Sequence, residues 1–402
     1  MTIPADRSDE MSSTNRNAEP SRMGSANAGS TRPSVAPIFQ SAAFDVEDLN
    51  QLEDIAVGRT PGYIYTRDNN PNHVALADAM ACLENAEAGA VFSSGMAAIA
   101  SVFQTLGNNR GHVIMSRALY GRTIQLAERM QQQFGLNFTL VDQTVPSEFA
   151  AARTDQTCFA LVETISNPLL EICDLDAVTA ALGDVPLVVD ATFTTPILIK
   201  CHDHGAAIVV HSASKYLNGH GDVMLGVASG SAEMMNQLRV TASIFGANAN
   251  PFESWLCQRG LRTLPLRMKQ VCATTRAIAE RLVGHPAVGR VHYPLLNDHK
   301  SYELATSLYP NGTGGIISFE LNGNGAEIVN RFMLASDSIP FSPSLADART
   351  TISYPAGTSH RFLSENARRE LGITNELVRL SVGLEPAELL IGELCQTLDT
   401  LL

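Results

Sequence analysis

The chain has 402 residues, of which 45% are hydrophobic and 17% are charged, and its formal net charge is −13. This length allows one large domain and a smaller one, and the composition is that of a globular protein. The acidic balance argues against binding to nucleic acid or to an anionic membrane, because such proteins neutralise phosphates with surplus Lys and Arg.

The N-terminal segment is polar and carries no apolar periodicity, which predicts a disordered tail over residues 1–30. This segment lacks the apolar core of a signal peptide, and no window of the chain approaches the roughly 18 apolar residues of a membrane span. The seven cysteines are scattered without a C-x-x-C pair, so we interpret them as reduced packing thiols and expect no metal site. Together these features predict a cytoplasmic protein.

An irregular arm is expected over residues 31–72, where Pro33, Pro37 and Pro61 interrupt any regular pattern. Beyond it, short apolar runs alternate with helical patterns, among them a helix from about His73. The predicted strands are Gly89–Ser93, His112–Ser116, Asn137–Val141, Cys158–Glu163, Pro186–Asp190, Ala207–Ser212 and Val223–Ser229. The helices predicted between them include Gly95–Leu106 and Arg122–Gln133. This alternation predicts an α/β domain over residues 73–265, with a mostly parallel seven-stranded sheet covered on both faces.

The pattern changes in the last third of the chain, which we interpret as a smaller α+β domain over residues 266–402. It begins with a long helical stretch, Leu266–Leu282, and ends with an amphipathic helix, Glu385–Leu402. Its predicted strands are Gly314–Leu321, Arg349–Ser353 and Val378–Val382.

Residues able to bind a ligand follow several predicted strands, and in α/β sheets ligands bind beyond the carboxyl ends of the strands. The first strand runs into residues 93–97 (SSGMA), where backbone N–H groups at a helix N-terminus suit a phosphate. The alternative is a plain strand-to-helix turn. Asp190 ends the fifth strand, and a carboxylate there needs a partner such as a protonated pyridine nitrogen. An ordinary cap or salt bridge is the alternative for Asp190.

Lys215 follows the sixth strand, between hydroxyls of Ser212 and Ser214 that can donate to a phosphate. Burial favours the neutral form of a Lys, which can form a Schiff base with an aldehyde. A surface Lys in a loop is the alternative. Pyridoxal phosphate (PLP) needs a Lys for its aldehyde, an acid for its ring nitrogen and a Gly/Ser turn for its phosphate. Because all three occur in order at strand ends, the sequence predicts a PLP enzyme.

Several motifs together resemble the Cys/Met-metabolism PLP enzymes, a family that includes cystathionine γ-synthase, cystathionine γ-lyase, cystathionine β-lyase, methionine γ-lyase and the O-acylhomoserine sulfhydrylases. The resemblance runs from about Thr31 to the C-terminus. The matching segments are 65–71 (YTRDNNP), 93–97 (SSGMA), 119–121 (LYG), 163–168 (ETISNP), 220–222 (HGD) and 379–385 (RLSVGLE). The resemblance implies the aspartate-aminotransferase-like fold of PLP-dependent transferases, known as fold type I.

The resemblance also implies a role for individual residues around the cofactor. The amides of Gly95 and Met96 bind the phosphate, Tyr120 stacks on the pyridine ring and Asn167 touches its 3-oxygen. Asp190 holds the ring nitrogen. Lys215, Tyr120 and Asp190 are the expected catalytic residues.

Substrate and subunit contacts are implied in the same way. Arg379 clamps the substrate α-carboxylate, since a guanidinium meets a carboxylate with two parallel hydrogen bonds, and Ser344 lies in a further substrate-binding segment. Tyr65 and Arg67 reach across a subunit interface to the neighbour's PLP phosphate. We therefore expect a homodimer or homotetramer with shared active sites.

Four positions depart from the family pattern. Ala346 replaces a Gly and Arg349 replaces a Glu in the segment 344–350 (SLADART). Pro343 stands where enzymes that handle cystathionine often carry a Glu. Arg122 stands where Gly or Cys is usual, either facing the pocket to favour an acidic or acyl-bearing substrate tail or lying on a solvated helix.

The expected activity is therefore that of a γ-acting enzyme of sulfur amino-acid metabolism (transsulfuration), with an amino acid as substrate. γ-Replacement, as in cystathionine γ-synthase or an O-acylhomoserine sulfhydrylase, and γ-elimination, as in cystathionine γ-lyase or methionine γ-lyase, both stay open. A PLP-binding protein without turnover is opposed by the intact set of catalytic residues. A Rossmann dehydrogenase is opposed by the lack of G-x-G-x-x-G after the first strand.

Overall fold

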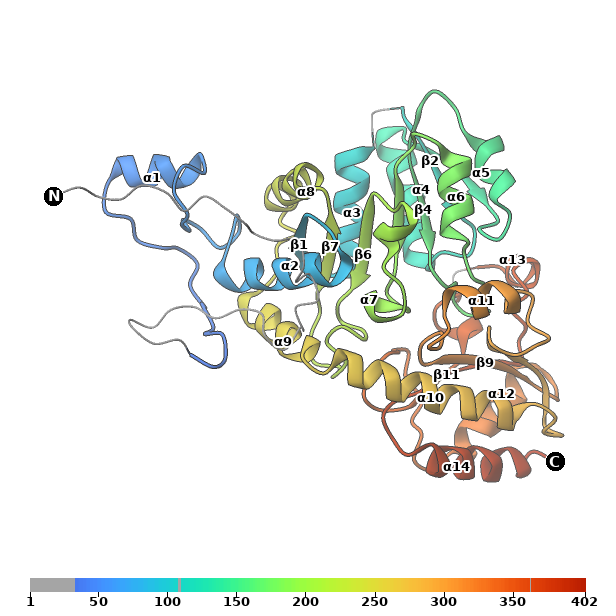
Figure 1. Cartoon of the computed structure of the whole chain (residues 1–402). Helices are drawn as coiled ribbons and strands as arrows, with labels where there is room; N and C mark the ends of the chain where they lie inside the picture. The colour runs from blue at the N-terminus through green and yellow to red at the C-terminus, as the bar shows by residue number, and fades with distance from the viewer. Residues whose placement is uncertain (1–32, 108–109, 362) are drawn as a thin grey trace.

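The computed structural model describes residues 33–107, 110–361 and 363–402, so the tail predicted over residues 1–30 lies outside the described chain. The chain forms an α/β body with a seven-stranded sheet, a smaller part with a four-stranded sheet and an N-terminal arm (Figure 1). Within the described ranges, no helix combines the length and the apolar character needed to cross a membrane. The division into arm, large domain and small domain at the predicted boundaries stays a prediction.

The large sheet has the strand order β1-β7-β6-β5-β4-β2-β3. Its strands are β1 (Ala88–Phe92), β2 (His112–Ser116), β3 (Asn137–Val141), β4 (Thr157–Glu163), β5 (Leu187–Asp190), β6 (Ile208–Ser212) and β7 (Gly226–Gly230). Strand β7 runs antiparallel to both of its neighbours, and the other pairs are parallel. The predicted mostly parallel seven-stranded sheet is thus confirmed.

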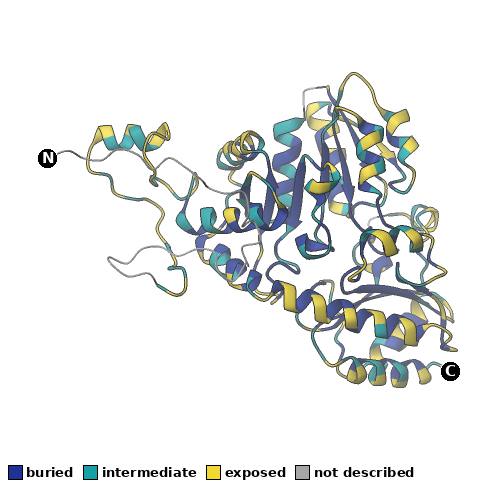
Figure 2. Cartoon of the chain, viewed as in Figure 1, coloured by how far each residue is buried: buried dark blue, intermediate teal, exposed yellow. Residues whose placement is uncertain are grey.

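Helices cover both faces of this sheet because its strands alternate apolar side chains between two cores. One core packs against α3 (Gly95–Leu106), α4 (Gly121–Phe134) and α8 (Ala232–Phe245). The other packs against α2 (Pro71–Glu84), α6 (Leu175–Leu182) and α9 (Pro251–Leu261). Most strands of the two sheets are buried, apart from the edge strand β3, whereas the outward sides of the helices are exposed (Figure 2). The shorter helices of this part are α5 (Pro146–Ala152), α7 (Thr195–Leu198) and η2 (Cys201–His204).

The smaller sheet has the order β10-β11-β9-β8 and is antiparallel throughout. Its strands are β8 (Val288–His292), β9 (Ile316–Leu321), β10 (Thr351–Ser353) and β11 (Leu377–Ser381). Apolar residues of α10 (Leu264–Leu282), α12 (Gly325–Ala335) and α14 (Ala387–Asp399) complete its core. The remaining helices are α11 (Tyr302–Leu308), η3 (Pro355–Gly357) and α13 (Glu365–Glu370).

Two sequence expectations about secondary structure are wrong. Strand β8 was not expected, because two exposed residues interrupt its apolar run. The arm is not wholly irregular either, since it contains α1 (Leu49–Ala56), whose first turn is capped by the Asp48 side chain accepting from the Gln51 N–H at 2.8 Å. No residue of α1 is buried, and the arm extends away from the α/β body (Figure 1).

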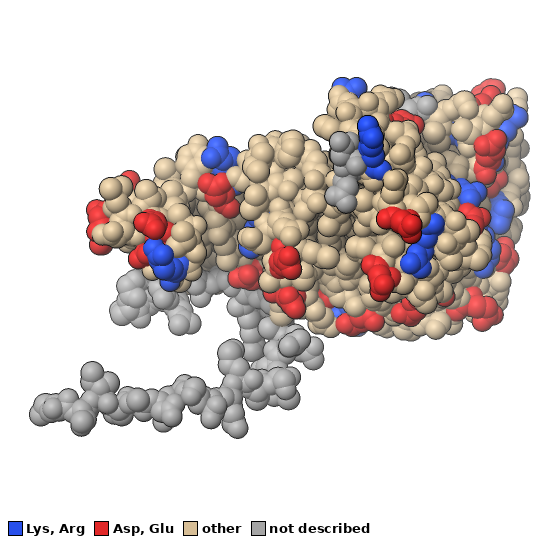
Figure 3. Space-filling model, turned by 90° about the horizontal axis from the view of Figure 1, so that it is seen from above, with Lys and Arg blue, Asp and Glu red and all other residues tan. Residues whose placement is uncertain are grey.

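Charged side chains of both signs are interspersed over the face seen in Figure 3, without a continuous basic area on the described part of that face. This distribution agrees with the acidic net charge of −13. None of the seven cysteines, all of which lie in the described part of the chain, forms a disulfide.

Candidate active site

The strand ends that the sequence singles out meet at one edge of the large sheet. Asp190 lies in register with Glu163 of β4 on one side and Val210 of β6 on the other. Ser212, at the end of β6, lies opposite Gly226 of β7, which in turn lies opposite the last residue of β1. The sheet therefore brings the phosphate turn, Ser212 and Asp190 to the same edge.

The predicted phosphate turn is packed tightly against the end of β6. Helix α3 begins at Gly95, and the Ser94 hydroxyl caps it by accepting from the Ala97 N–H at 3.0 Å. A Cβ at Gly95 would lie 2.9 Å from Ser212 Cβ, a separation that real side chains essentially never show. Only a Gly fits there. The N–H groups of Gly95 and Met96 belong to the first turn of α3, which lies beside the Ser212 hydroxyl.

The Asp190 carboxylate is held by a residue that the sequence analysis did not select. Its Oδ1 accepts from the Thr192 N–H at 3.0 Å and from the Thr192 hydroxyl at 2.5 Å, and Thr192 Oγ1 accepts from the Ser212 N–H at 2.8 Å. The pKa of Asp190 is raised overall by burial, although the two bonds from Thr192, and next His211, lower it. A hydroxyl two positions after an Asp is the local signal for such a turn.

Lys215 lies where the two sheets approach each other. Its Nζ donates to the Ser344 hydroxyl at 3.4 Å. Burial, and next the Arg379 guanidinium, lower the pKa of Lys215, whereas Asp347 raises it. The environment thus favours the neutral amine.

Arg379 reaches this site from β11 of the small sheet and is only 2% exposed. It donates from Nη1 to the Asn167 amide oxygen at 3.1 Å and from Nη2 to the Ser344 carbonyl at 3.4 Å. Among the described residues, none bonds to its buried Nε, and none forms a salt bridge with the guanidinium. Burial lowers the pKa of Arg379 to about 10, which leaves it charged at neutral pH. The charged Arg379 guanidinium is therefore buried without an anionic partner among the described residues, which is unfavourable until an anion binds.

The histidine next to this guanidinium is neutral. His360 is buried, and burial, followed by Arg379 and Arg368, lowers its pKa to about 4. Its Nδ1 lies 2.8 Å from the Ser359 hydroxyl. His360 therefore supplies no charge to compete with a ligand of Arg379.

Tyr120 stands at the N-terminus of α4, and 41% of it is exposed. Its backbone N–H donates to Glu163 Oε1 at 2.7 Å. Arg122 lies on the exposed side of the same first turn, where it donates to Gln125 at 2.8 Å. Arg349 is exposed as well.

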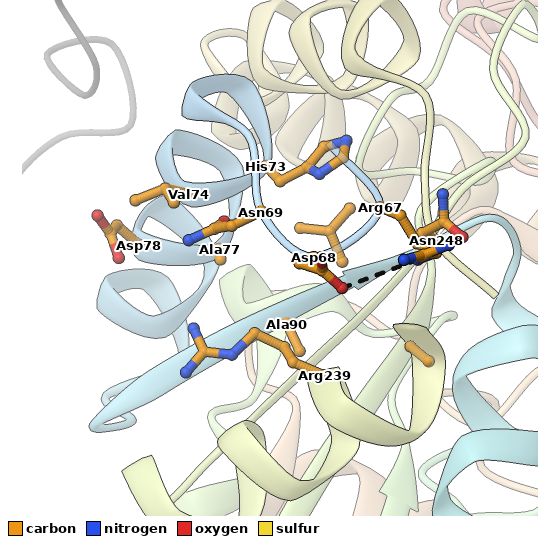
Figure 4. A pocket seen from close by; sticks show the side chains of 12 residues that line it. Arg67, Asp68, Asn69, His73, Val74, Ala77, Asp78, Ala90, Arg239 and Asn248 are labelled. Atoms are coloured by element: carbon orange, nitrogen blue, oxygen red, sulfur yellow. Dashed lines mark ion pairs between the residues drawn. The ribbon is translucent and has the colours of Figure 1, made fainter. Parts of the chain in front are cut away.

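Ser214 and the arm residues lie differently from the residues above. The Ser214 hydroxyl accepts from the Leu225 N–H at 3.0 Å and donates to the Leu225 carbonyl at 3.4 Å. Tyr65 and Arg67 line a separate hollow with residues 40–42 and 248–251. Figure 4 shows a second hollow that Arg67 also lines, where Arg67 Nε lies 3.8 Å from the Asp68 carboxylate.

The loop that carries Ser344 adopts a backbone conformation suited to the Gly that the family pattern has there. Ala346 has a φ of +63°, in the left-handed region that L-residues rarely adopt. Its N–H donates to the Ser381 hydroxyl at 2.7 Å, which ties the loop to the strand of Arg379.

Comparison with known proteins identifies the family. The family model described as "Cys/Met metabolism PLP-dependent enzyme" matches residues 21–399. The chain belongs to this family. It is therefore a PLP-dependent enzyme of sulfur amino-acid metabolism, and the fold type I architecture expected from the resemblance is confirmed.

Three relatives illustrate the range of activities in this family. The chain is 36% identical to L-methionine gamma-lyase of Treponema denticola, over 91% of this chain and 92% of the relative. It is 38% identical to cystathionine gamma-lyase of Bacillus subtilis, over 86% of this chain and 90% of the relative. It superposes with a TM-score of 0.86 and 34% identity on cystathionine gamma synthase of Xanthomonas oryzae pv. oryzae in complex with aminoacrylate and cysteine, covering 92% and 93% of the two chains.

The residues present fit the cofactor of this PLP family. The lack of a Cβ at Gly95 lets the start of α3 pack against Ser212, which brings its first N–H groups beside the Ser212 hydroxyl. Both bonds from Thr192 fall on Oδ1 of Asp190, so its other oxygen is available to a ring nitrogen. The depressed pKa of Lys215 suits an amine that bonds to an aldehyde.

Proposed function

We propose that this PLP enzyme removes the γ-substituent of a sulfur-containing L-amino acid such as methionine. The observation that carries the proposal is the buried Arg379 guanidinium, which has no carboxylate partner among the described residues and lies beside a Lys with a depressed pKa. Elimination rather than replacement is supported by the similarity to L-methionine gamma-lyases. Pro343, at the position where a Glu is common in cystathionine-handling enzymes, supports a substrate without a distal ammonium.

Residues at the sheet edge would hold the cofactor. The amides of Gly95 and Met96 and the Ser212 hydroxyl would hold its phosphate, and Asp190 its ring nitrogen. Tyr120 would cover the ring, and Asn167 would contact the 3-oxygen. The Ser214 hydroxyl would join the phosphate contacts by exchanging its bond to the Leu225 carbonyl. When bound, PLP supplies an aldehyde that bonds to amines and a ring that withdraws electrons from the substrate α-carbon.

The chain's own groups would bind the substrate and move its protons. Arg379 donates two hydrogen bonds to the α-carboxylate, which fixes the α-carbon relative to Lys215. The neutral Lys215 amine would take the proton from that carbon, pass it to the cofactor and, neutral again, take one from the β-carbon. Ser344, which touches both residues, keeps Lys215 Nζ and Arg379 together. The partly exposed Tyr120 phenol protonates the departing sulfur.

The assay follows from the balanced reaction, in which methionine and water give 2-oxobutyrate, ammonia and methanethiol. We expect 2-oxobutyrate from L-methionine without added thiol. Formation of cystathionine from an O-acylhomoserine and cysteine, without this elimination, would contradict the proposal. That outcome would favour the second candidate, γ-replacement, which the likeness to the cystathionine gamma synthase structure supports.

We also propose that two copies of the chain share their active sites through the arm. Tyr65 is 42% exposed, and Arg67 is exposed too, so both are accessible to another subunit. Large apolar side chains are exposed on the arm and on α8 and α9, as expected of surfaces that a second copy covers. They are Leu49, Val57, Val240, Ile244, Phe245 and Phe252.

A mixing experiment tests this shared site. Arg67→Ala and Lys215→Ala are each expected to inactivate the enzyme, but dimers that contain one copy of each regain one intact site. Random pairing after equal co-expression restores about a quarter of the wild-type sites, because one site in each mixed dimer has both residues. Tyr65→Phe in place of Arg67→Ala is expected to weaken PLP retention without unfolding the subunit. Tandem-purified mixed dimers that stay inactive would show that each site uses only its own chain.

A further inference from the structure

Glu163 lies between two residues expected to contact the cofactor, although neither its motif nor the proposed mechanism gives it a role. It ends β4 in register with Asp190, which ends β5. The Glu163 residue is buried. Its Oε1 accepts the backbone N–H of Tyr120 at 2.7 Å, so one side chain links the end of β4 to the start of α4.

The start of α4 is not held by a side chain of its own cap residue. The first N–H groups of a helix have no partner within it and are usually capped by a Ser, Thr, Asp or Asn side chain. Here the cap position is Tyr120, which makes no side-chain cap bond, and the first turn contains no acidic residue. Glu163 accepts from the N–H of the cap residue itself, so it fixes the backbone of Tyr120 at the point where α4 begins.

The two carboxyl groups differ in how well their surroundings stabilise a negative charge. Burial, and then the neighbouring Asp190, raise the pKa of Glu163 well above its usual value, whereas the bond from Tyr120 lowers it. Thr192 donates two hydrogen bonds to Asp190. Burial raises the pKa of Asp190 as well, but Asp190 accepts two hydrogen bonds from Thr192 and Glu163 accepts one, so a negative charge is better stabilised on Asp190. A neutral Glu163 still accepts from the Tyr120 N–H through its carbonyl oxygen.

We propose that Glu163 is a positioning residue, which holds Tyr120 over the cofactor ring as a neutral hydrogen-bond acceptor and leaves the negative charge beside the ring to Asp190. The inference rests on the proposed roles of Tyr120 and Asp190. It predicts that an acceptor of the same shape replaces Glu163 without loss, because the ionised form is not needed.

The test compares Glu163→Gln with Glu163→Met in the purified holoenzyme. Gln keeps the acceptor oxygen and cannot ionise, whereas Met keeps the volume and has no comparable acceptor. We expect Gln to bind PLP within about twofold of the wild type, and Met to weaken PLP binding about tenfold, as for a buried N–H that loses its acceptor. The circular dichroism of the bound cofactor, which depends on how it lies in the site, is expected to change only for Met. Glu148→Met, at an exposed Glu that pairs with Arg117, is the control.

A double-mutant cycle separates positioning from general destabilisation. If Glu163 acts through Tyr120, Glu163→Met has little further effect on PLP affinity once Tyr120 is Ala. Equal loss in the Gln and Met variants, no loss in Met, or a full additive loss in the Tyr120→Ala background would each overturn the inference. Should the Met variant not fold, the Gln variant and its cofactor dichroism still decide it. Failure of the wild type to bind PLP would instead overturn the proposed function.

Discussion

Lys215→Ala is expected to abolish the absorption of the bound cofactor at roughly 420 nm and to lower turnover at least about 10³-fold. Wild-type Lys215 is poised for both tasks, because burial and the Arg379 guanidinium depress its pKa and favour the neutral amine. An amine that bonds to an aldehyde and an amine that takes a proton from carbon must both be neutral. Spectra of the purified protein with added PLP, and 2-oxobutyrate release, measure the two effects.

The chain contains few lysines, so each alternative to Lys215 can be tested. The chain has four, and the other three are Lys200, Lys269 and Lys300. Lys269→Ala, at an exposed position on α10, is the control and is expected to keep both band and activity. After borohydride reduction, peptide mapping is expected to find the pyridoxyl group on Lys215. A label on another lysine, or a band that survives in Lys215→Ala, would refute the assignment.

Most strands of the large sheet are predictable from the sequence because they are buried, and the run Asn137–Val141 predicts β3 although most of this edge strand is exposed. Strands β2 and β3 begin and end where the apolar runs predict. Strand β8 is not predicted from the sequence, because its residues Gly289 and Arg290 are exposed and interrupt its apolar run. Helix α1 is not predicted either. None of its residues is buried, so its sequence does not need an apolar face.

Site residues are predictable where the chemistry is local to a strand end, as for Asp190 and Lys215. The link from Glu163 to Asp190 is not, because it depends on the register of β4 against β5 across 27 positions (190 − 163). The contact between Lys215 and Ser344 spans 129 positions and depends on how the two sheets face each other. The periodicity of the sequence carries no information about either of these contacts. For Arg379, only the resemblance to a family supplied a role.

Arg379→Lys is expected to lower kcat/KM for L-methionine by about 10²–10⁴-fold. A hydrogen bond to a charged group contributes roughly 1.5–3 kcal/mol, and Lys cannot make the two parallel bonds that a guanidinium makes to a carboxylate. The loss is expected mainly in KM, because the α-carboxylate is held in the ground state and the transition state alike. Initial rates of 2-oxobutyrate formation over a range of methionine concentrations separate the two constants.

A substrate analogue without the carboxylate distinguishes this role from a structural one. Wild-type enzyme is expected to bind 3-(methylthio)propylamine far more weakly than methionine, and Arg379→Lys is expected to lose most of this discrimination, since the variant no longer makes the contact that the analogue lacks. Arg122→Leu, at the exposed Arg bonded to Gln125, is the matched control and should discriminate as the wild type does. Full discrimination in Arg379→Lys would assign the carboxylate to another group. The buried guanidinium would then serve only to join Asn167 to the Ser344 loop.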